Sequence, residues 1–184
     1  KNYWVNGIDP KDERLIIIAA LLHDIGKAGD GIYSYFSKEL HPQNGTDYLV
    51  GQKKYTLFAG GEFNFPELFK QLGLEPQEIM IIVFLVRAHW LFGSYLSKFT
   101  RGEQPSNFSF NEELAGYAKE VGLALDQQLT KMAILIGAAD IRGLHHVQFD
   151  SAIIDSLFGR SMVAEADKES FSAKDSAYWY DEKL

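Results

Sequence analysis

The feature that most constrains this chain is an apolar stretch that ends directly in two polar residues. Residues 15–22 are all apolar, and His23 and Asp24 follow without a spacer. An apolar stretch of this kind favours a buried helix, and a buried charge is costly unless it is paired or coordinates a metal. The doublet therefore indicates one of two arrangements, a salt-bridged pair or a metal site.

Further residues of metal-ligand type stand in comparable contexts. His89 ends the most apolar predicted helix, Asp140 lies in another strongly apolar one, and His41 sits at a helix start or bend. Each of them needs a partner of its own when buried, so together they favour the metal site. The chain contains no cysteine, so a metal has to take nitrogen and oxygen ligands. The remaining histidines, His145 and His146, are typical of surface or linker positions.

Glycines lie within about one helical turn of each candidate ligand. Because residues three and four apart share a helix face, they predict open space beside the ligands, as a substrate requires. The alternative is that several of them only end helices. The glycines are Gly26, Gly45, Gly93, Gly137 and Gly143.

The apolar periodicity is helical nearly throughout, and strong strand alternation is absent. This pattern predicts an all-α fold, a single-domain helical bundle over residues 1–160, with a tail over 161–184 that packs on or near it. The polar stretch 93–111 is long enough to predict a functional loop or lid. Helices are predicted over about 9–25, 33–50 with a restart near Pro42, 64–73, 75–92, 111–121, 126–142 and 148–158.

Charge and hydropathy restrict the partners. The 184 residues carry a net charge of −7 and no block of Lys or Arg, which argues against long nucleic acid as a partner. The longest apolar run, near 79–86, is shorter than the ~18 residues of a spanning helix, and no secretory signal is visible. We therefore expect a cytoplasmic protein without a membrane anchor; an oligomer is compatible with the sequence.

The run Leu21 to Lys27 resembles the signature of the HD-domain superfamily of metal-dependent phosphohydrolases, in the subgroup with His-Asp-Ile-Gly. The resemblance covers roughly residues 15–143. The family pattern ends on a distant aspartate, which Asp140 matches, and members with two metals have further histidines, which His41 and His89 match. The family's first histidine lies on a preceding helix. Residues 1–22 contain no histidine, so we expect that helix, or that ligand, to be missing.

The resemblance implies an HD-type helical fold with one or two divalent metals, from Fe, Mn, Co, Ni or Zn, and Asp24 as a bridge between them. A metal-activated water would hydrolyse a phosphomonoester or phosphodiester of a nucleotide or another small molecule. Asp24 and Lys27 would be catalytic, and Lys27 and Arg142 would bind the substrate. For Lys27 the alternative is a cation at a helix C-terminus, and for Arg142 a structural ion pair. The implied metal ligands are His23, Asp24, His41, His89 and Asp140.

Three alternatives stay open at this point. Some HD-fold proteins hold a di-iron centre and act as oxygenases, and His41 and His89 are compatible with that chemistry. A degenerate, non-catalytic HD module agrees with the missing first histidine. An HD domain attached to a nucleotidyltransferase resembles the surroundings of Asp140, although the acidity of the chain argues against tRNA as a partner.

Overall fold

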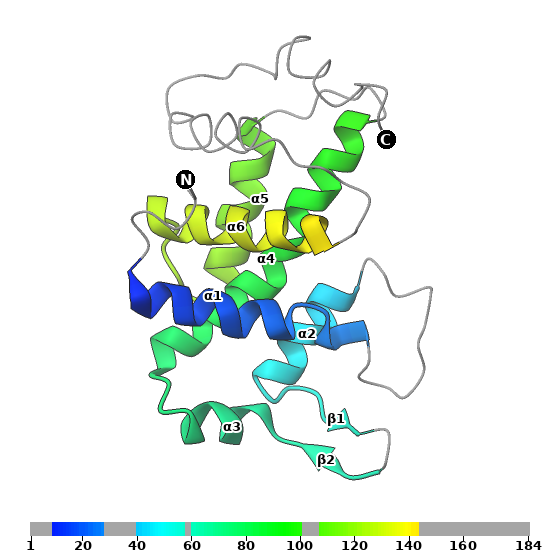
Figure 1. Cartoon of the computed structure of the whole chain (residues 1–184), viewed down its shortest axis with the longest axis vertical. Helices are drawn as coiled ribbons and strands as arrows, with labels where there is room; N and C mark the ends of the chain where they lie inside the picture. Colours follow the sequence, from blue (N-terminus) through cyan, green and yellow to red (C-terminus); the bar gives the residue numbers. More distant parts are fainter. Residues whose placement is uncertain (1–8, 28–39, 58–59, 101–106, 144–184) are drawn as a thin grey trace. The chain divides into compact units, whose positions relative to one another are not determined.

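A computed structural model describes residues 9–27, 40–57, 60–100 and 107–143 (Figure 1). These residues are mostly helical, with one small β-hairpin, and this confirms the predicted all-α class. The chain divides into two compact units, residues 1–88 with 121–123 and residues 89–120 with 124–184.

The first unit is helical around a short hairpin. Strands β1 and β2 pair antiparallel, with Tyr55 opposite Phe63. In chain order the elements are α1 (Pro10–Leu22), the 3₁₀ helix η1 (Ile25–Lys27), α2 (His41–Leu49), β1 (Tyr55–Thr56), β2 (Glu62–Phe63), α3 (Phe65–Gln71) and the first part of α4 (Pro76–Thr100).

Local capping explains where these helices begin. The Asp9 side chain accepts a hydrogen bond of 2.8 Å from the backbone N–H of Lys11, and Asn64 accepts one of 3.1 Å from Glu67. A short polar side chain at this position satisfies an N–H that the helix leaves without a partner. Both starts agree with the predicted ones, but α1 ends at Leu22 rather than near residue 25.

The hairpin is the element that the sequence did not predict. Its strands have two residues each, too short to show an alternating pattern. The Tyr55 ring packs edge-on against Tyr48, at 5.4 Å between centroids, and against Phe65, at 5.5 Å. Tyr48 and Phe65 are both buried. Aromatic packing therefore stabilises the hairpin. No local sequence pattern predicts this packing, because its partners lie in other elements.

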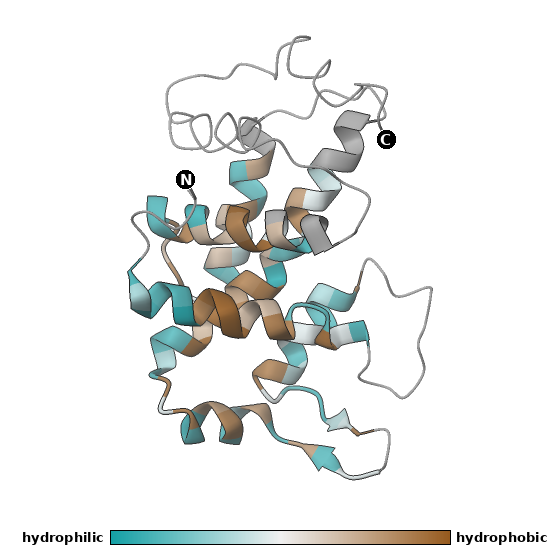
Figure 2. Cartoon of the chain, viewed as in Figure 1, coloured by the Kyte–Doolittle hydropathy of each residue, from teal (hydrophilic) through white to brown (hydrophobic). Residues whose placement is uncertain are grey.

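Helix α4 supplies the most apolar part of the core (Figure 2). Residues 82–86 are each at most 1% exposed. By length and composition alone the stretch Pro76–Tyr95 could cross a membrane, and 56% of its most apolar window is buried inside the structure. The core helix of a globular protein passes the same test, so one such helix is weak evidence for a membrane.

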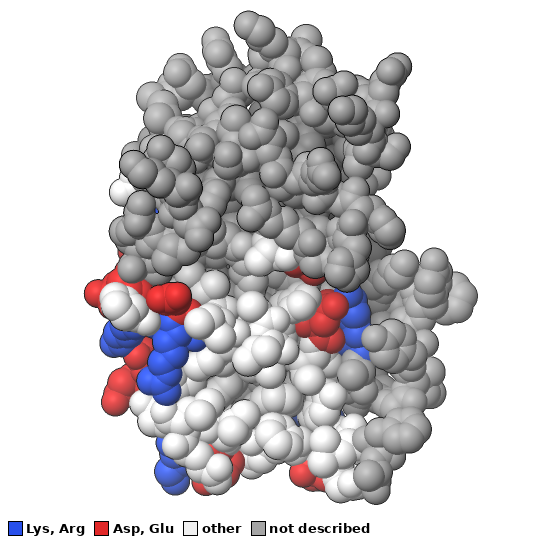
Figure 3. Space-filling model, in the orientation of Figure 1, with Lys and Arg blue, Asp and Glu red and all other residues white. Residues whose placement is uncertain are grey.

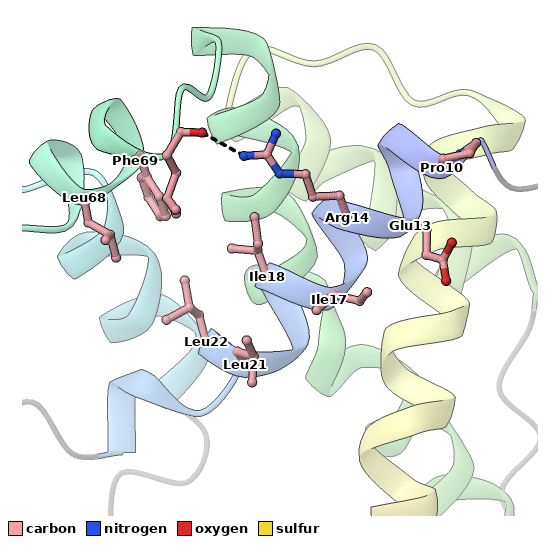
Figure 4. Close-up of a pocket in the computed structure, with 10 residues that line it drawn as sticks. Pro10, Glu13, Arg14, Ile17, Ile18, Leu21, Leu22, Leu68 and Phe69 are labelled. Atoms are coloured by element: carbon pink, nitrogen blue, oxygen red, sulfur yellow. Dashed lines mark hydrogen bonds between the residues drawn. The ribbon is translucent and has the colours of Figure 1, made fainter.

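Helix α1 is buried on one side only. Leu15 and Ala19 are at most 1% exposed, whereas Ile17 is 53% and Leu21 80% exposed. The expectation of a fully buried stretch is therefore wrong, because only one stripe of the helix meets the core. The exposed side lines a groove of about 670 Å³ beside α3, where Arg14 donates a hydrogen bond to the Leu72 carbonyl (Figure 4). None of the candidate metal ligands lines this groove.

The second unit contains the rest of α4, α5 (Asn107–Glu120) and α6 (Gln127–Gly143). The loop predicted over 93–111 is wrong at both ends, since α4 continues to Thr100 and α5 begins at Asn107. Tyr95 stabilises this extension: its hydroxyl donates to Glu113 at 2.9 Å, and its ring packs on Phe110. Residues 101–106, the predicted helix 148–158 and the tail lie outside the described residues.

The N-terminus of α4 is closed by Glu78. Its Oε2 accepts a hydrogen bond of 2.7 Å from the backbone N–H of Glu75, as in a capping box. Its Oε1 lies 3.2 Å from the ammonium of Lys11 on α1. The backbone hydrogen bond, followed by the contact with Lys11, lowers the pKa of Glu78 below its ordinary value of 4.5. The ionised carboxylate therefore ties α1 to α4.

Glu78→Gln is expected to lower the free energy of unfolding by about 1 kcal/mol at neutral pH, because it removes charge from two hydrogen-bonded contacts. A depressed pKa contributes stability above the ordinary value of 4.5, and that contribution is lost as the pH falls. Urea unfolding should therefore show the two proteins converging as the pH falls below 4.5 and the carboxylate of Glu78 is protonated. Glu62→Gln is the control, since the exposed Glu62–Lys54 pair should contribute little. A difference between wild type and Glu78→Gln that does not shrink at any acid pH at which both proteins still fold would contradict the assignment.

Candidate metal centre

The candidate site is built on a close contact between η1 and α2, which lie side by side in Figure 1. Gly26 is buried, and a Cβ on it would overlap the carbonyl oxygen of His41 and lie 2.6 Å from the backbone nitrogen of Gly45. A Cβ on Gly45 would in turn approach Ile25 at 3.4 Å. Glycine at both positions therefore lets the two backbones touch.

These glycines do not provide the predicted open space. At Gly26 and Gly45 the space is filled by backbone and side chains, and at Gly137 a Cβ would lie 2.6 Å from Cβ of Phe92. The prediction is wrong for these three positions. A glycine near a ligand has two uses, an open cavity or a close helix contact, and the spacing along the chain does not distinguish them.

The structure brings together three of the predicted ligands, Asp24, His41 and His89. Each offers one ligand atom, and the three atoms lie within 4.8 Å of one another. The imidazoles of His41 and His89 are buried, 0% and 1% exposed. The position of His89 follows from α4: three residues earlier, Val86 Cγ1 faces Gly45 of α2, and residues three apart share a helix face.

The carboxylate of Asp24 is oriented for a cation. Its Oδ1 is buried and accepts no hydrogen bond, although His41 Nε2 lies 3.2 Å away. The two atoms are thus near each other without forming a good hydrogen bond. A metal ion beside these two atoms would give Asp24 Oδ1 a partner.

His23 is fixed by the end of α1. Its Nδ1 lies 2.7 Å from the carbonyl oxygen of Ala20, which can only accept, so Nδ1 carries the proton. Nε2 then lies on the side of Asp24, 3.5 Å from its Oδ2. Metal-binding histidines are commonly held by a backbone carbonyl in this manner. The sequence contained a signal for this contact, because the last carbonyls of a helix lack intrahelical partners.

Lys27 forms an ion pair with Asp24, with Nζ 2.6 Å from Oδ2. Partial burial alone would raise the pKa of Asp24. The contacts with His41 and Lys27, together with the electrostatic interaction with His23 and Lys27, outweigh burial and hold this pKa well below its ordinary value. Asp24 is therefore ionised at neutral pH, as a metal ligand has to be.

The other predicted site residues are not in this group. Among the described residues, the group of three includes neither His23 nor Asp140. Asp140 lies on α6, partly exposed, and its role as a ligand stays a prediction. Arg142 also lies on α6, but its side chain, like His145 and His146, lies outside the part that the structure describes.

Gly26→Ala is expected to destabilise the protein by about 1–3 kcal/mol and to reduce its metal content, because the added methyl group would push α2 and His41 away from Asp24. Gly116→Ala is the control: no atom lies within 4 Å of a Cβ at this helical position, so it should be neutral or stabilising by up to about 1 kcal/mol. Urea unfolding and elemental analysis measure both effects. Unchanged metal content in Gly26→Ala would show that the contact does not position the ligands.

Comparison with known proteins agrees with this geometry. The model of the HD domain family matches residues 3–105, more than half of the chain, and the matched region contains all three grouped ligands. Asp140 lies beyond it. No curated protein and no solved structure matches the chain significantly. The match supports the superfamily and leaves the His-Asp-Ile-Gly subgroup as a resemblance. By this match the chain belongs to the HD domain family.

Proposed function

We propose that this chain is a metal-dependent phosphohydrolase that cleaves a phosphomonoester or phosphodiester of a small molecule. The observation that carries the proposal is the grouping of Asp24, His41 and His89, with ligand atoms within 4.8 Å, in a member of the HD domain family.

The chemistry of these residues fits a divalent transition metal. Imidazole and carboxylate without thiolate suit Mn, Fe, Co, Ni or Zn. The carboxylate of Asp24 is ionised, and the imidazoles of His41 and His89 are buried. All three residues can therefore serve as ligands in the positions that they occupy. When bound, such an ion would supply a water of lowered pKa and would hold phosphoryl oxygens.

The residues around the ligands have separate roles. Asp24 would bind the metal through Oδ1 and would stay ionised because of its neighbours. Lys27 is one-third exposed at its side chain, so its ammonium can meet a phosphate that enters from solvent and can neutralise charge that develops on it. His23, held by Ala20, presents Nε2 toward Asp24 and would extend the ligand set.

A small, nucleotide-type substrate agrees with the charge of the protein. The chain carries a net charge of −7. On the face that Figure 3 shows, acidic and basic side chains of the described residues lie next to one another instead of forming a basic patch. A long nucleic acid would require such a patch, whereas one phosphate group needs only a local cation. We propose a cytoplasmic location on the same sequence grounds as above.

The metal content and hydrolytic activity of ligand variants test the proposal. His41→Ala, His89→Ala and Asp24→Asn should each weaken metal binding on the order of 100-fold or more. They should also abolish metal-dependent hydrolysis of p-nitrophenyl phosphate or bis(p-nitrophenyl) phosphate. Asp47→Asn is the matched control: this acid lies on α2 and pairs with Lys53, outside the ligand group, so metal binding should be unchanged.

Other outcomes would replace the proposal. Two irons with oxygen-dependent turnover, and no release from the phosphate esters, would favour the di-iron oxygenase. A protein that binds no metal and cleaves neither ester would favour the non-catalytic module. Retention of the metal in both His41→Ala and His89→Ala would show that the centre lies elsewhere.

A further inference from the structure

We infer that residues 3–8, which precede α1, fold back along this helix and place Trp4 in the apolar groove between α1 and α3. The inference goes beyond the proposed function, because none of the candidate metal ligands lines this groove. The segment and the groove both belong to the first compact unit. The segment itself lies outside the described residues.

The groove has apolar walls and a cation at one end. Ile18 and Leu22 of α1 face Leu68 of α3 across it (Figure 4). Arg14 joins the two walls at one end, where it donates a hydrogen bond of 2.7 Å to the Leu72 carbonyl. The volume of about 670 Å³ lies within the roughly 300–1,000 Å³ of pockets that take whole ligands. An aromatic side chain suits such a groove, because a guanidinium packs favourably on an aromatic face.

Several apolar side chains at this groove are exposed together. Ile17 is 53% and Leu21 80% exposed on α1, and Leu72, which follows α3, is 42% exposed. Single exposed apolar residues are common on protein surfaces, whereas a group of them around a groove marks a surface that another apolar group covers.

The segment before α1 has the composition that this surface requires. Residues 2–8 carry no charged side chain, so they can leave water without the cost of burying a charge. In an extended segment alternate side chains share a face. Trp4 and Ile8 therefore face one side and Tyr3 faces the other. Trp4 supplies the large apolar surface and the aromatic ring.

The connection to α1 gives the segment the required reach. Asp9, directly before the helix, has extended backbone angles, φ −61° and ψ 139°, so the preceding residues do not continue α1. Trp4 stands six residues before Pro10, which corresponds to at most about 20 Å of extended chain. The helix rises about 18 Å from Pro10 to Leu22. Because Pro10 itself lines the groove, Trp4 can reach any point along it.

The fluorescence of Trp4 in the full chain tests the inference. The chain has three tryptophans, and Trp90→Phe combined with Trp179→Phe leaves only Trp4. Acrylamide should quench Trp4 about threefold less in the folded protein than in urea, because packed side chains exclude the quencher. Leu68→Glu places a charge in the groove and should raise quenching to the value in urea. Leu57→Glu is the control, since Leu57 is exposed and does not line the groove.

A second pair of variants changes the segment and leaves the groove intact. Trp4→Ala should open the groove to 1-anilinonaphthalene-8-sulfonate, which fluoresces on exposed apolar surface, and raise the dye signal about threefold over wild type. Tyr3→Ala, on the opposite face of the segment, should leave the signal unchanged. Circular dichroism shows whether each variant is folded, and light scattering gives the mass of the species that is measured.

Different results would overturn the inference in different ways. Quenching of Trp4 in the folded protein as strong as in urea would leave the segment in solvent. Shielding that persists in folded Leu68→Glu would place Trp4 outside the groove. Shielding that is lost on dilution, together with a dimeric mass, would assign the groove to a second copy of the chain. If Leu68→Glu does not fold, an equal dye signal in Trp4→Ala and Tyr3→Ala would still overturn the inference.

Discussion

The contact of Gly26 with the backbone of α2 is the constraint on which the site depends. It leaves no room for a side chain between η1 and the first turn of α2, so Asp24, two residues earlier, reaches His41. Val86 packs against the same part of α2 and sets the face of α4 that carries His89. Ligands from three separate segments therefore meet because two glycines remove the atoms that would keep the segments apart.

The electrostatics of the site follow from this close packing. Partial burial of Asp24 disfavours its charge, and the groups that surround it restore the charge. These groups differ from one another. His41 is fully buried, and its Nε2 lies 3.2 Å from Oδ1. Lys27 forms an ion pair of 2.6 Å with Oδ2, and its side chain is partly exposed to solvent. Oδ1 therefore lies on the side of the carboxylate where the three candidate ligand atoms gather, and Oδ2 lies on the side where Lys27 balances its charge.

Local signals in the sequence were sufficient for some parts of the structure and not for others. The helix starts at Asp9 and Asn64 were predictable because a cap acts within three residues. The extension of α4 beyond Gly93 was not, because the contact that supports it joins Tyr95 to Glu113, far along the chain. The ligand types of the site were predictable, and three of them do gather. The close helix contacts at the glycines were not predictable, since they depend on residues that lie elsewhere in the chain.

The orientation of His23 follows from the one stripe of α1 that is buried. Leu15, Ala19 and His23 are four residues apart and lie on one face of the helix, and the first two are at most 1% exposed. The stripe of Ile17 and Leu21 points to solvent instead, although its residues are equally apolar. The buried stripe therefore directs His23 inward. The apolarity of the whole stretch does not explain the orientation of His23. Its position along the helix does, since a shift of two residues would place it on the face of Ile17 and Leu21, which lines the outer groove.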